Sequence, residues 1–164
     1  MLPMRQRFAP LVLLLASLGA LAAALVVQYG FGLEPCHLCT LQRIPYGFVL
    51  LLALVALADG RDANLRGLLL GLAALAFAAN AGIAFFHIGV ERHWWEASCS
   101  GGENLATSAG SLLAHLRQGK AAPACDSVPF ALFGLSLAGL NLIFSLILTL
   151  FAAVATRRAF LGRW

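Results

Sequence analysis

Apolar residues are gathered into four long runs along the chain, and short polar segments separate the runs. The runs cover about residues 8–29, 40–58, 65–89 and 128–155. Since a helix rises about 1.5 Å per residue, each run can cross a hydrocarbon core of about 30 Å, the second only if its helix begins near Cys39. The pattern predicts an all-α membrane protein, a four-transmembrane-helix bundle that forms a single domain over residues 1–164.

Composition favours a membrane protein over a soluble one. Of the 164 residues, 61% are hydrophobic and 11% are charged, whereas charged residues make up about 25% of a typical soluble domain. The formal net charge of +4 comes from basic residues near the ends of the runs, which indicates membrane topology rather than a nucleic-acid surface. The first run follows a basic N-terminus, as in a signal peptide, but it is too long for one, so we expect a retained span.

Arginine residues mark one side of the membrane. The two chain ends and the connection between the second and third runs carry Arg5, Arg7, Arg61, Arg66, Arg157, Arg158 and Arg163. The basic residues of the other two connections and their flanks are Arg43, Arg92, Arg117 and Lys120. The positive-inside rule therefore predicts cytoplasmic termini and outer loops at about 30–39 and 90–127. All four cysteines then lie in or beside these outer loops.

The longer outer loop contains a short helical pattern. Apolar residues recur at helical spacing at Leu105, Ala109, Leu112, Leu113 and Leu116. We expect a short amphipathic helix that either lies flat on the bilayer or packs on the rest of the protein. After Cys125, the sequence Asp126-Ser127-Val128-Pro129 combines a capping side chain with a proline, and it predicts the start of the last span.

The spacing of the cysteines favours one of three possible pairings. Cys36 and Cys39 form a C-x-x-C motif, which is redox-active more often than structural because one of its thiols is activated as a thiolate. Cys99 and Cys125 would be the partner pair in the longer loop. Two other interpretations stay open. One is a pair of permanent disulfide staples, and the other is a zinc site that adds Cys99, Cys125, His37 or His93 to the motif.

Redox-active thiols need an electron acceptor, and a membrane offers quinone. Cys39 would begin the second span beside the headgroups, and Arg43 follows on the same helical face at i+4. Its guanidinium would stabilise a Cys39 thiolate and bind a quinone oxygen, or it would simply reach the lipid headgroups. His87, near the outer end of the third span, is either a proton donor to reduced quinone or a hydrogen-bonded interface residue. Asn80 and Asn141 indicate hydrogen bonds between helices.

These features resemble the DsbB family. The resemblance rests on Glu34-Pro35-Cys36-His37-Leu38-Cys39 followed by Arg43, on Cys99 and Cys125 in the second outer loop, and on Phe133-Gly134-Leu135. Members of that family are four-helix proteins of the bacterial inner membrane that reoxidise the periplasmic thiol oxidase DsbA with ubiquinone or menaquinone. The resemblance implies the same membrane, cysteines in the periplasm, a DsbA-like thioredoxin-fold partner and a quinone.

The resemblance also implies an order of action for the four cysteines. The thiolate of the partner protein would attack Cys99 and form a mixed disulfide, which releases Cys125. Cys125 would then attack Cys36. Electrons would leave the protein through Cys39.

Quinone binding is the last property that the resemblance implies, with Cys39, Arg43 and His87 around the quinone. The chain departs from the family's pattern at Gln42, where some members have an acidic residue, and in the acidic and aromatic stretch 89–95. The second departure favours a dedicated partner. Two other functions would use the same features: a membrane thiol reductant or isomerase that runs electrons outward, and a non-enzymatic scaffold with stapled loops.

Overall fold

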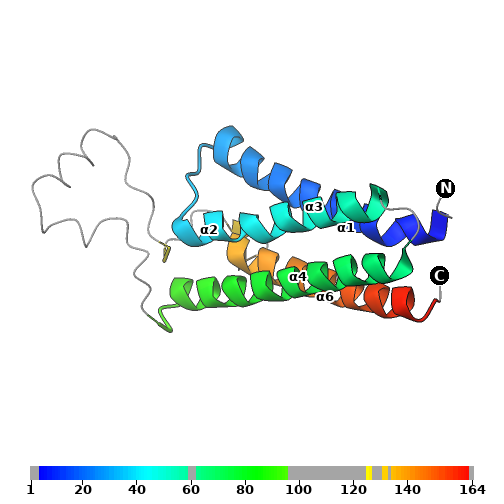
Figure 1. The fold of residues 1–164 in the computed structure, drawn as a ribbon. Coiled ribbons are helices and arrows are strands. Elements are labelled where there is room, and N and C mark those ends of the chain that lie inside the picture. Colours follow the sequence, from blue (N-terminus) through cyan, green and yellow to red (C-terminus); the bar gives the residue numbers. More distant parts are fainter. Residues whose placement is uncertain (1–3, 59–61, 96–124, 127–130, 133, 163–164) are drawn as a thin grey trace, which may run out of the picture.

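A computed structural model of the chain describes residues 4–58, 62–95, 125–126, 131–132 and 134–162. Within them, four helical stretches are long and apolar enough to cross a membrane: Gln6–Gly30, His37–Ala58, Ala63–Glu91 and Leu137–Phe160. They run side by side, and the two chain ends lie at the same end of the bundle (Figure 1). The predicted four-helix membrane bundle is therefore confirmed. The amphipathic helix predicted for the longer outer loop lies outside the described residues.

Each of the first two spans consists of two helical segments. The first is α1 (Met4–Leu25), which continues into the π-helical turn η1 (Val26–Gly30). The second is divided into α2 (His37–Leu41) and α3 (Arg43–Ala58). Pro45 explains this division, because it has no N–H to donate and its ring crowds the carbonyl four residues earlier.

The fourth span begins later than the sequence predicts. The expected range 128–155 is wrong, because the helix is α6 (Leu137–Phe160). A short antiparallel pair of strands precedes it, β1 (Ala131–Leu132) and β2 (Leu135–Ser136). Gly134 makes the turn between them with a φ of 79°, a conformation that glycine adopts easily. The side chain of Ser136 then caps α6, with its Oγ accepting a hydrogen bond from the Gly139 N–H at 3.1 Å.

Small side chains allow the helices to approach closely. The third span, α4 (Ala63–Glu91), packs along α6, while α1 packs along α3. Their common core is rich in alanine: Ala9, Ala53, Ala73, Ala152, Ala155 and Ala159. A Cβ on Gly67 would lie 2.8 Å from the Phe160 ring, so α4 and α6 are in close contact there. Since lipid tails are as apolar as leucine, close packing of this kind is what holds membrane helices together.

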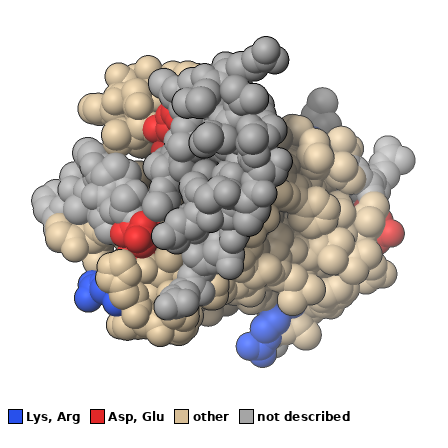
Figure 2. Space-filling model, turned by 90° about the vertical axis from the view of Figure 1, so that its left-hand side faces the viewer, with Lys and Arg blue, Asp and Glu red and all other residues tan. Residues whose placement is uncertain are grey.

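Two names for the ends of the bundle are useful below. The terminal end carries both chain ends, and the thiol end carries Cys36 and Cys39 (Figure 1). Seen directly onto the thiol end, the described surface is mostly uncharged, with scattered acidic and basic groups (Figure 2). A strongly basic face, as a nucleic-acid partner would need, is not visible on the described part of this surface.

A compact turn closes α4 at the thiol end. The N–H of Trp94 donates to the Gly89 carbonyl at 2.8 Å, and His93 has the left-handed φ of 54° that such a helix end requires. Trp95 folds back onto α4, where its indole N–H donates to the Phe86 carbonyl at 2.9 Å and its ring stacks on the Phe86 ring. A Cβ on Gly89 would collide with the Trp95 ring, so this packing requires a glycine.

Candidate redox site

The C-x-x-C motif forms the first turn of the second span, because that helix begins at His37 instead of near residue 40. Cys36 caps the helix, and its Sγ accepts a hydrogen bond from the Cys39 N–H at 3.3 Å. The two sulfur atoms lie 3.1 Å apart, and the Cys36 thiol donates to Cys39 Sγ. Cys36 is buried and Cys39 is half-buried. The local helix geometry thus presents the two thiols to each other for oxidation.

Cys36 holds its proton tightly. The hydrogen bond to Cys39, together with burial, raises the pKa of the Cys36 thiol from its usual 9.0 to about 12. In that hydrogen bond the Cys39 sulfur is the acceptor, and an acceptor position favours negative charge. The geometry therefore favours Cys39 as the thiolate of the reduced pair.

His87 lies beside Cys36, near the thiol end of α4. Its imidazole is buried, with Nε2 3.7 Å from Cys36 Sγ and Nδ1 3.0 Å from Gln42 Nε2. One turn later, Glu91 places Oε1 3.9 Å from His87 Nε2, and its other oxygen accepts a hydrogen bond from Ser136 at the start of α6. His87 is therefore both a hydrogen-bonded residue between helices and a neighbour of the thiol pair.

Arg43 turns toward the first span. Its Nη1 donates to Gln28 Oε1 at 2.7 Å, and its Nη2 lies 3.5 Å from the Ala24 carbonyl oxygen. Gln28 belongs to the π-helical turn η1, and such turns are frequent at functional sites because they reorient side chains within a helix. Arg43 and Cys39 line the same cavity, as their i+4 spacing predicts.

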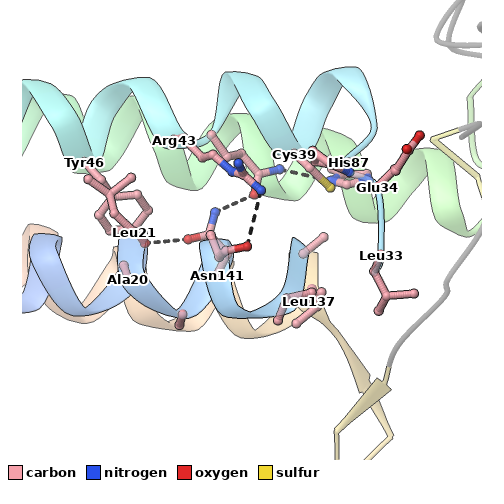
Figure 3. A pocket seen from close by; sticks show the side chains of 16 residues that line it. Ala20, Leu21, Leu33, Glu34, Cys39, Arg43, Tyr46, His87, Leu137 and Asn141 are labelled. Carbon is pink, nitrogen blue, oxygen red and sulfur yellow. Dashed lines mark hydrogen bonds between the residues drawn. The ribbon is translucent and has the colours of Figure 1, made fainter. Parts of the chain in front are cut away.

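This cavity has a volume of about 220 Å³ and lies among side chains of all four spans (Figure 3). Much of its wall is aliphatic, with Ala20, Leu21, Ala23, Val27, Leu33, Leu137 and Ala138. Its polar lining is Glu34, Cys39, Gln42, Arg43, Tyr46, His87 and Asn141. An apolar pocket into which a few polar groups converge is typical of sites for small organic ligands. All three residues that the resemblance assigns to quinone line this cavity.

A buried chain of hydrogen bonds leads from His87 toward the middle of the bundle (Figure 3). Gln42 donates to His87 through Nε2 and accepts from Asn141 Nδ2 through Oε1. The Oδ1 of Asn141 in turn accepts from the Tyr46 hydroxyl, and Asn80 Nδ2 lies 3.5 Å away from it. The predicted hydrogen bonding of Asn80 and Asn141 between helices is therefore confirmed.

Cys125 joins the C-x-x-C pair in one small cluster. It is 2% exposed, and it packs with Cys36, Leu38 and Val90. The structure thus brings together three of the four predicted catalytic cysteines, which come from two different connections. Cys99 lies outside the described residues, so its pairing with Cys125 and its role stay predictions.

Three possible metal ligands also meet at this site. The sulfur atoms of Cys36 and Cys39 and an imidazole nitrogen of His87 all lie within 4.8 Å of one another. Thiolate and imidazole are the ligands that zinc prefers. The zinc interpretation of the sequence used His37 or His93 instead, but both are exposed, and neither belongs to this group of described residues.

Several polar neighbours of the thiols were not predicted as site residues: Gln28, Gln42, Tyr46 and Glu91. A signal for the two glutamines was present, because each is a polar residue within or beside an apolar run, and such residues in membrane spans are usually functional. Their partners could not be read from the sequence. The partner of Gln42 on α6, for example, is 99 positions away in the chain.

Several known proteins similar to this chain share one name. The family model described as Disulfide bond formation protein DsbB matches residues 6–155. Disulfide bond formation protein B of Cupriavidus necator is 32% identical over 153 residues, which cover 90% of this chain and 91% of that protein. The protein of the same name from Methylobacillus flagellatus is 33% identical over 145 residues, covering 85% and 86%. The one from Xanthomonas campestris is 42% identical over 78 residues, covering 47% and 45%.

No solved structure matches the chain. The family model nevertheless covers the first three membrane helices, the fourth up to residue 155 and both cysteines of the C-x-x-C motif, and two relatives align over most of their length. The chain therefore belongs to the DsbB family of disulfide bond formation proteins.

Proposed function

We propose that this chain is a thiol:quinone oxidoreductase, which reoxidises a periplasmic DsbA-like protein and passes the electrons to a membrane quinone. The position of the C-x-x-C pair carries this proposal. On one side, Cys125 packs with Cys36, and on the other side Cys39 lines a cavity together with Arg43. A thiol pair between a third cysteine and an apolar cavity supports electron flow from protein thiols to a membrane-soluble acceptor.

The cavity suits the head group of ubiquinone or menaquinone. Its aliphatic wall would cover the faces of a flat ring, while the Arg43 guanidinium would hold a ring oxygen and steady the Cys39 thiolate. When bound, the quinone takes up two electrons and two protons. Since Arg43 hydrogen-bonds Gln28, its guanidinium is already positioned before a ligand arrives.

Four thiol–disulfide exchanges bring oxidising power from the C-x-x-C pair to the partner. A partner thiolate attacks Cys99 in a Cys99–Cys125 disulfide and releases the Cys125 thiolate. Cys125 attacks Cys36, which breaks the Cys36–Cys39 bond and leaves Cys39 as a thiolate. The second partner thiol closes the partner's disulfide and frees Cys99, which then attacks Cys125 and displaces Cys36. The partner has lost two electrons and two protons. The reduced pair of Cys36 and Cys39 carries these electrons and protons until the quinone takes them.

We further propose that the termini lie in the cytoplasm and the thiol end in the periplasm, because the arginine-rich segments gather at the terminal end. A reporter that is active only in the cytoplasm, fused after the last residue, is expected to work. One that is active only in the periplasm is expected to fail there. The reverse result would overturn this orientation.

The deciding experiment is a turnover assay with the purified protein. Reduced DsbA-like protein is mixed with a short-chain quinone, and both thiol loss and quinone absorbance are followed. We expect equal loss of dithiol and quinone with the protein, and background rates with Cys39→Ser. A protein that instead reduces a partner disulfide with quinol would be a reductant, and a protein that does neither would be a scaffold.

A trapping experiment tests the order of the cysteines. Cys125→Ser leaves Cys99 as a thiol and removes the thiol that would move on to Cys36. The variant is therefore mixed with the oxidised partner, whose disulfide the Cys99 thiolate attacks, and the resulting mixed disulfide is expected to accumulate because Cys125 is not present to displace the partner. Cys99→Ser is the matched control and is expected to give no adduct. If Cys125→Ser gives no adduct with any oxidised thioredoxin-fold partner, the order of exchange is wrong.

A further inference from the structure

Two amides lie between His87 and the interior of the bundle, and the exchanges described above do not use them. We propose that Gln42 is a positioning residue, which together with Asn141 holds His87 in the tautomer whose Nε2–H points at Cys36. The benefit for electron transfer rests on the function proposed above, whereas the tautomer itself can be measured without partner or quinone.

The two ring nitrogens of His87 have different partners. Nδ1 lies 3.0 Å from Gln42 Nε2, and Nε2 lies 3.7 Å from Cys36 Sγ. A neutral imidazole carries one proton, so one nitrogen donates and the other accepts. If Gln42 presents its amide N–H₂, Nδ1 must accept, and the proton is then on Nε2. The tautomer of His87 is therefore decided by which end of the Gln42 amide faces it.

Asn141 decides the orientation of Gln42. Its Nδ2 donates to Gln42 Oε1, so the oxygen of Gln42 faces α6 and its nitrogen faces His87. A reversed Gln42 would bring two N–H₂ groups together at Asn141 and would leave both without an acceptor. An amide is suited to this position because it can accept on one side and donate on the other.

The orientation of Asn141 is itself held by the donors around its oxygen. The Tyr46 hydroxyl donates to Asn141 Oδ1, and both Asn80 Nδ2 and Ser145 Oγ lie 3.5 Å from it. Asn80 and Ser145 are fully buried, and they also bond each other at 2.9 Å. Reversing Asn141 would point its own N–H₂ at the N–H₂ of Asn80 and would require both hydroxyls to turn from donors into acceptors. The direction of donation along this series of hydrogen bonds therefore runs from the buried interior, through Asn141 and Gln42, to His87.

The direction of these hydrogen bonds matters for the step in which Cys36 is displaced from its disulfide with Cys125. When Cys99 displaces Cys36 from Cys125, negative charge develops on the Cys36 sulfur, and a thiol with a high pKa is a poor leaving group. The Nε2–H of His87 points at this sulfur and can stabilise the charge. The other groups that face the imidazole are the thiol of Cys39, the carboxylate of Glu91 and the backbone of Cys125. Gln42 faces the imidazole from the second span and bonds its Nδ1.

The test is nitrogen NMR of the reduced protein labelled in its four histidines, with His87→Gln to assign the His87 signals. In the wild type, we expect a protonated Nε2 and an unprotonated Nδ1. Gln42→Glu has nearly the same shape and still accepts from Asn141, but it cannot donate, so we expect a protonated Nδ1. The matched control is Gln6→Glu, which makes the same change beside Arg66 at the terminal end and is expected to leave His87 unchanged.

Asn141→Asp is a second variant, because it keeps the oxygen that accepts from Tyr46 but removes the donor to Gln42. Since a carboxylate only accepts, we expect Gln42 to reverse and donate to it, so that the Gln42 oxygen faces His87 and the proton of His87 lies on Nδ1. In turnover assays, Gln42→Glu is expected to change the pH profile of the exchange step, because a carboxylate replaces the amide at Nδ1 of His87. Gln6→Glu is expected to leave that profile in place.

An unprotonated Nε2 in the wild type would overturn the proposal, as would ring signals that are the same in Gln42→Glu and wild type. An unchanged tautomer in Asn141→Asp would remove Asn141 from the mechanism. If the ring signals behave as expected but no quinone-linked turnover is found, the proposed function fails while the role of Gln42 in positioning His87 stands.

Discussion

Toward the terminal end the helices meet mainly through alanine and glycine, beside one buried arginine, Arg66, which donates to Gln6. At the thiol end they meet through amides, a hydroxyl and an imidazole. Ala73 of α4 and Ala152 of α6 are almost completely buried in the first region. Gln42, His87 and Asn141 connect three spans in the second. Polar groups within a membrane are costly unless they are fully bonded, and close packing alone can hold helices together. The thiol end therefore pays a cost in stability for chemistry, and the two ends are expected to respond differently to substitution.

The largest expected effect is that of Arg43→Ala at the thiol end. Loss of the guanidinium beside Cys39 is expected to lower kcat/KM for quinone by about a hundredfold, as removal of one preorganised donor typically does. Unfolding of the variant in detergent is expected to match the wild type. The matched control is Arg92→Ala, since Arg92 is exposed and does not line the cavity. Equal turnover of Arg43→Ala and wild type would mean that Arg43 serves only the lipid surface.

A substitution in the core of the bundle is expected to have the opposite effect, a loss of stability without a loss of activity. Ala152→Leu inserts a large side chain where no part of the residue is exposed, and such overpacking costs about 1–3 kcal/mol. We expect a lower free energy of unfolding, with kcat/KM for quinone within about twofold of wild type for the folded fraction. Ala153→Leu, on the exposed face of the same helix, is expected to be neutral. If both variants lost stability equally, alanine packing between α4 and α6 would not explain the fold.

The titration of the thiol pair gives an intermediate effect. The pKa of the Cys36 thiol is raised from 9.0 to about 12, so its contribution to stability is complete below pH 9 and is lost as the pH rises toward 12. With Cys99 and Cys125 replaced by serine, the ultraviolet thiolate signal of the reduced pair is expected to rise in two steps, the second above pH 9. Cys39→Ala removes the larger cause and is expected to lower the pKa of Cys36 by about one unit or more. A complete titration below pH 9 with both thiols present would contradict this result.

The smallest expected effect separates bonded from unbonded polar groups in the core. Asn80→Leu removes the hydrogen bond from Asn80 Nδ2 to Ser145, while Asn80 Oδ1 has no hydrogen-bond partner within the described residues. Interhelical bonds of this kind contribute about 0.6 kcal/mol to stability. Ser17 is also fully buried, but its hydroxyl has no hydrogen-bond partner within the described part of the chain. Ser17→Ala is therefore expected to leave the free energy of unfolding unchanged or to raise it slightly. A larger loss for Ser17→Ala than for Asn80→Leu would contradict the assignment.

The four spans could be predicted from the sequence because the bilayer demands long apolar runs. The sequence also predicted that Cys39 and Arg43 lie together, because i+4 spacing is a local property of a helix, and both line one cavity. The start of α6 could not be predicted. Asp126 to Pro129 carry start signals that depend only on local chemistry. The observed cap is Ser136, the last residue of β2, which also bonds Glu91 from α4. When tertiary contacts determine where a helix begins, a rule based on neighbouring residues in the sequence cannot predict that position.

The residue at position 42 shows the same limit at the site. The resemblance to the DsbB family implies an acidic side chain there in some members, and from the sequence alone the glutamine has no explanation. In the structure it lies between His87 and Asn141 and bonds both. A carboxylate would accept from Asn141 but could not donate to His87, so the amide matches the two neighbours that this chain provides.

The folded-back position of Trp95 gives the protein an optical reporter. Its ring packs against the cluster that contains Cys36 and Cys125, and excited indole rings are quenched by nearby disulfides. Replacing the other two tryptophans, Trp94 and Trp164, with phenylalanine would leave one fluorophore beside the thiol pair. Its emission would then follow each oxidation and reduction as it happens, without any added dye.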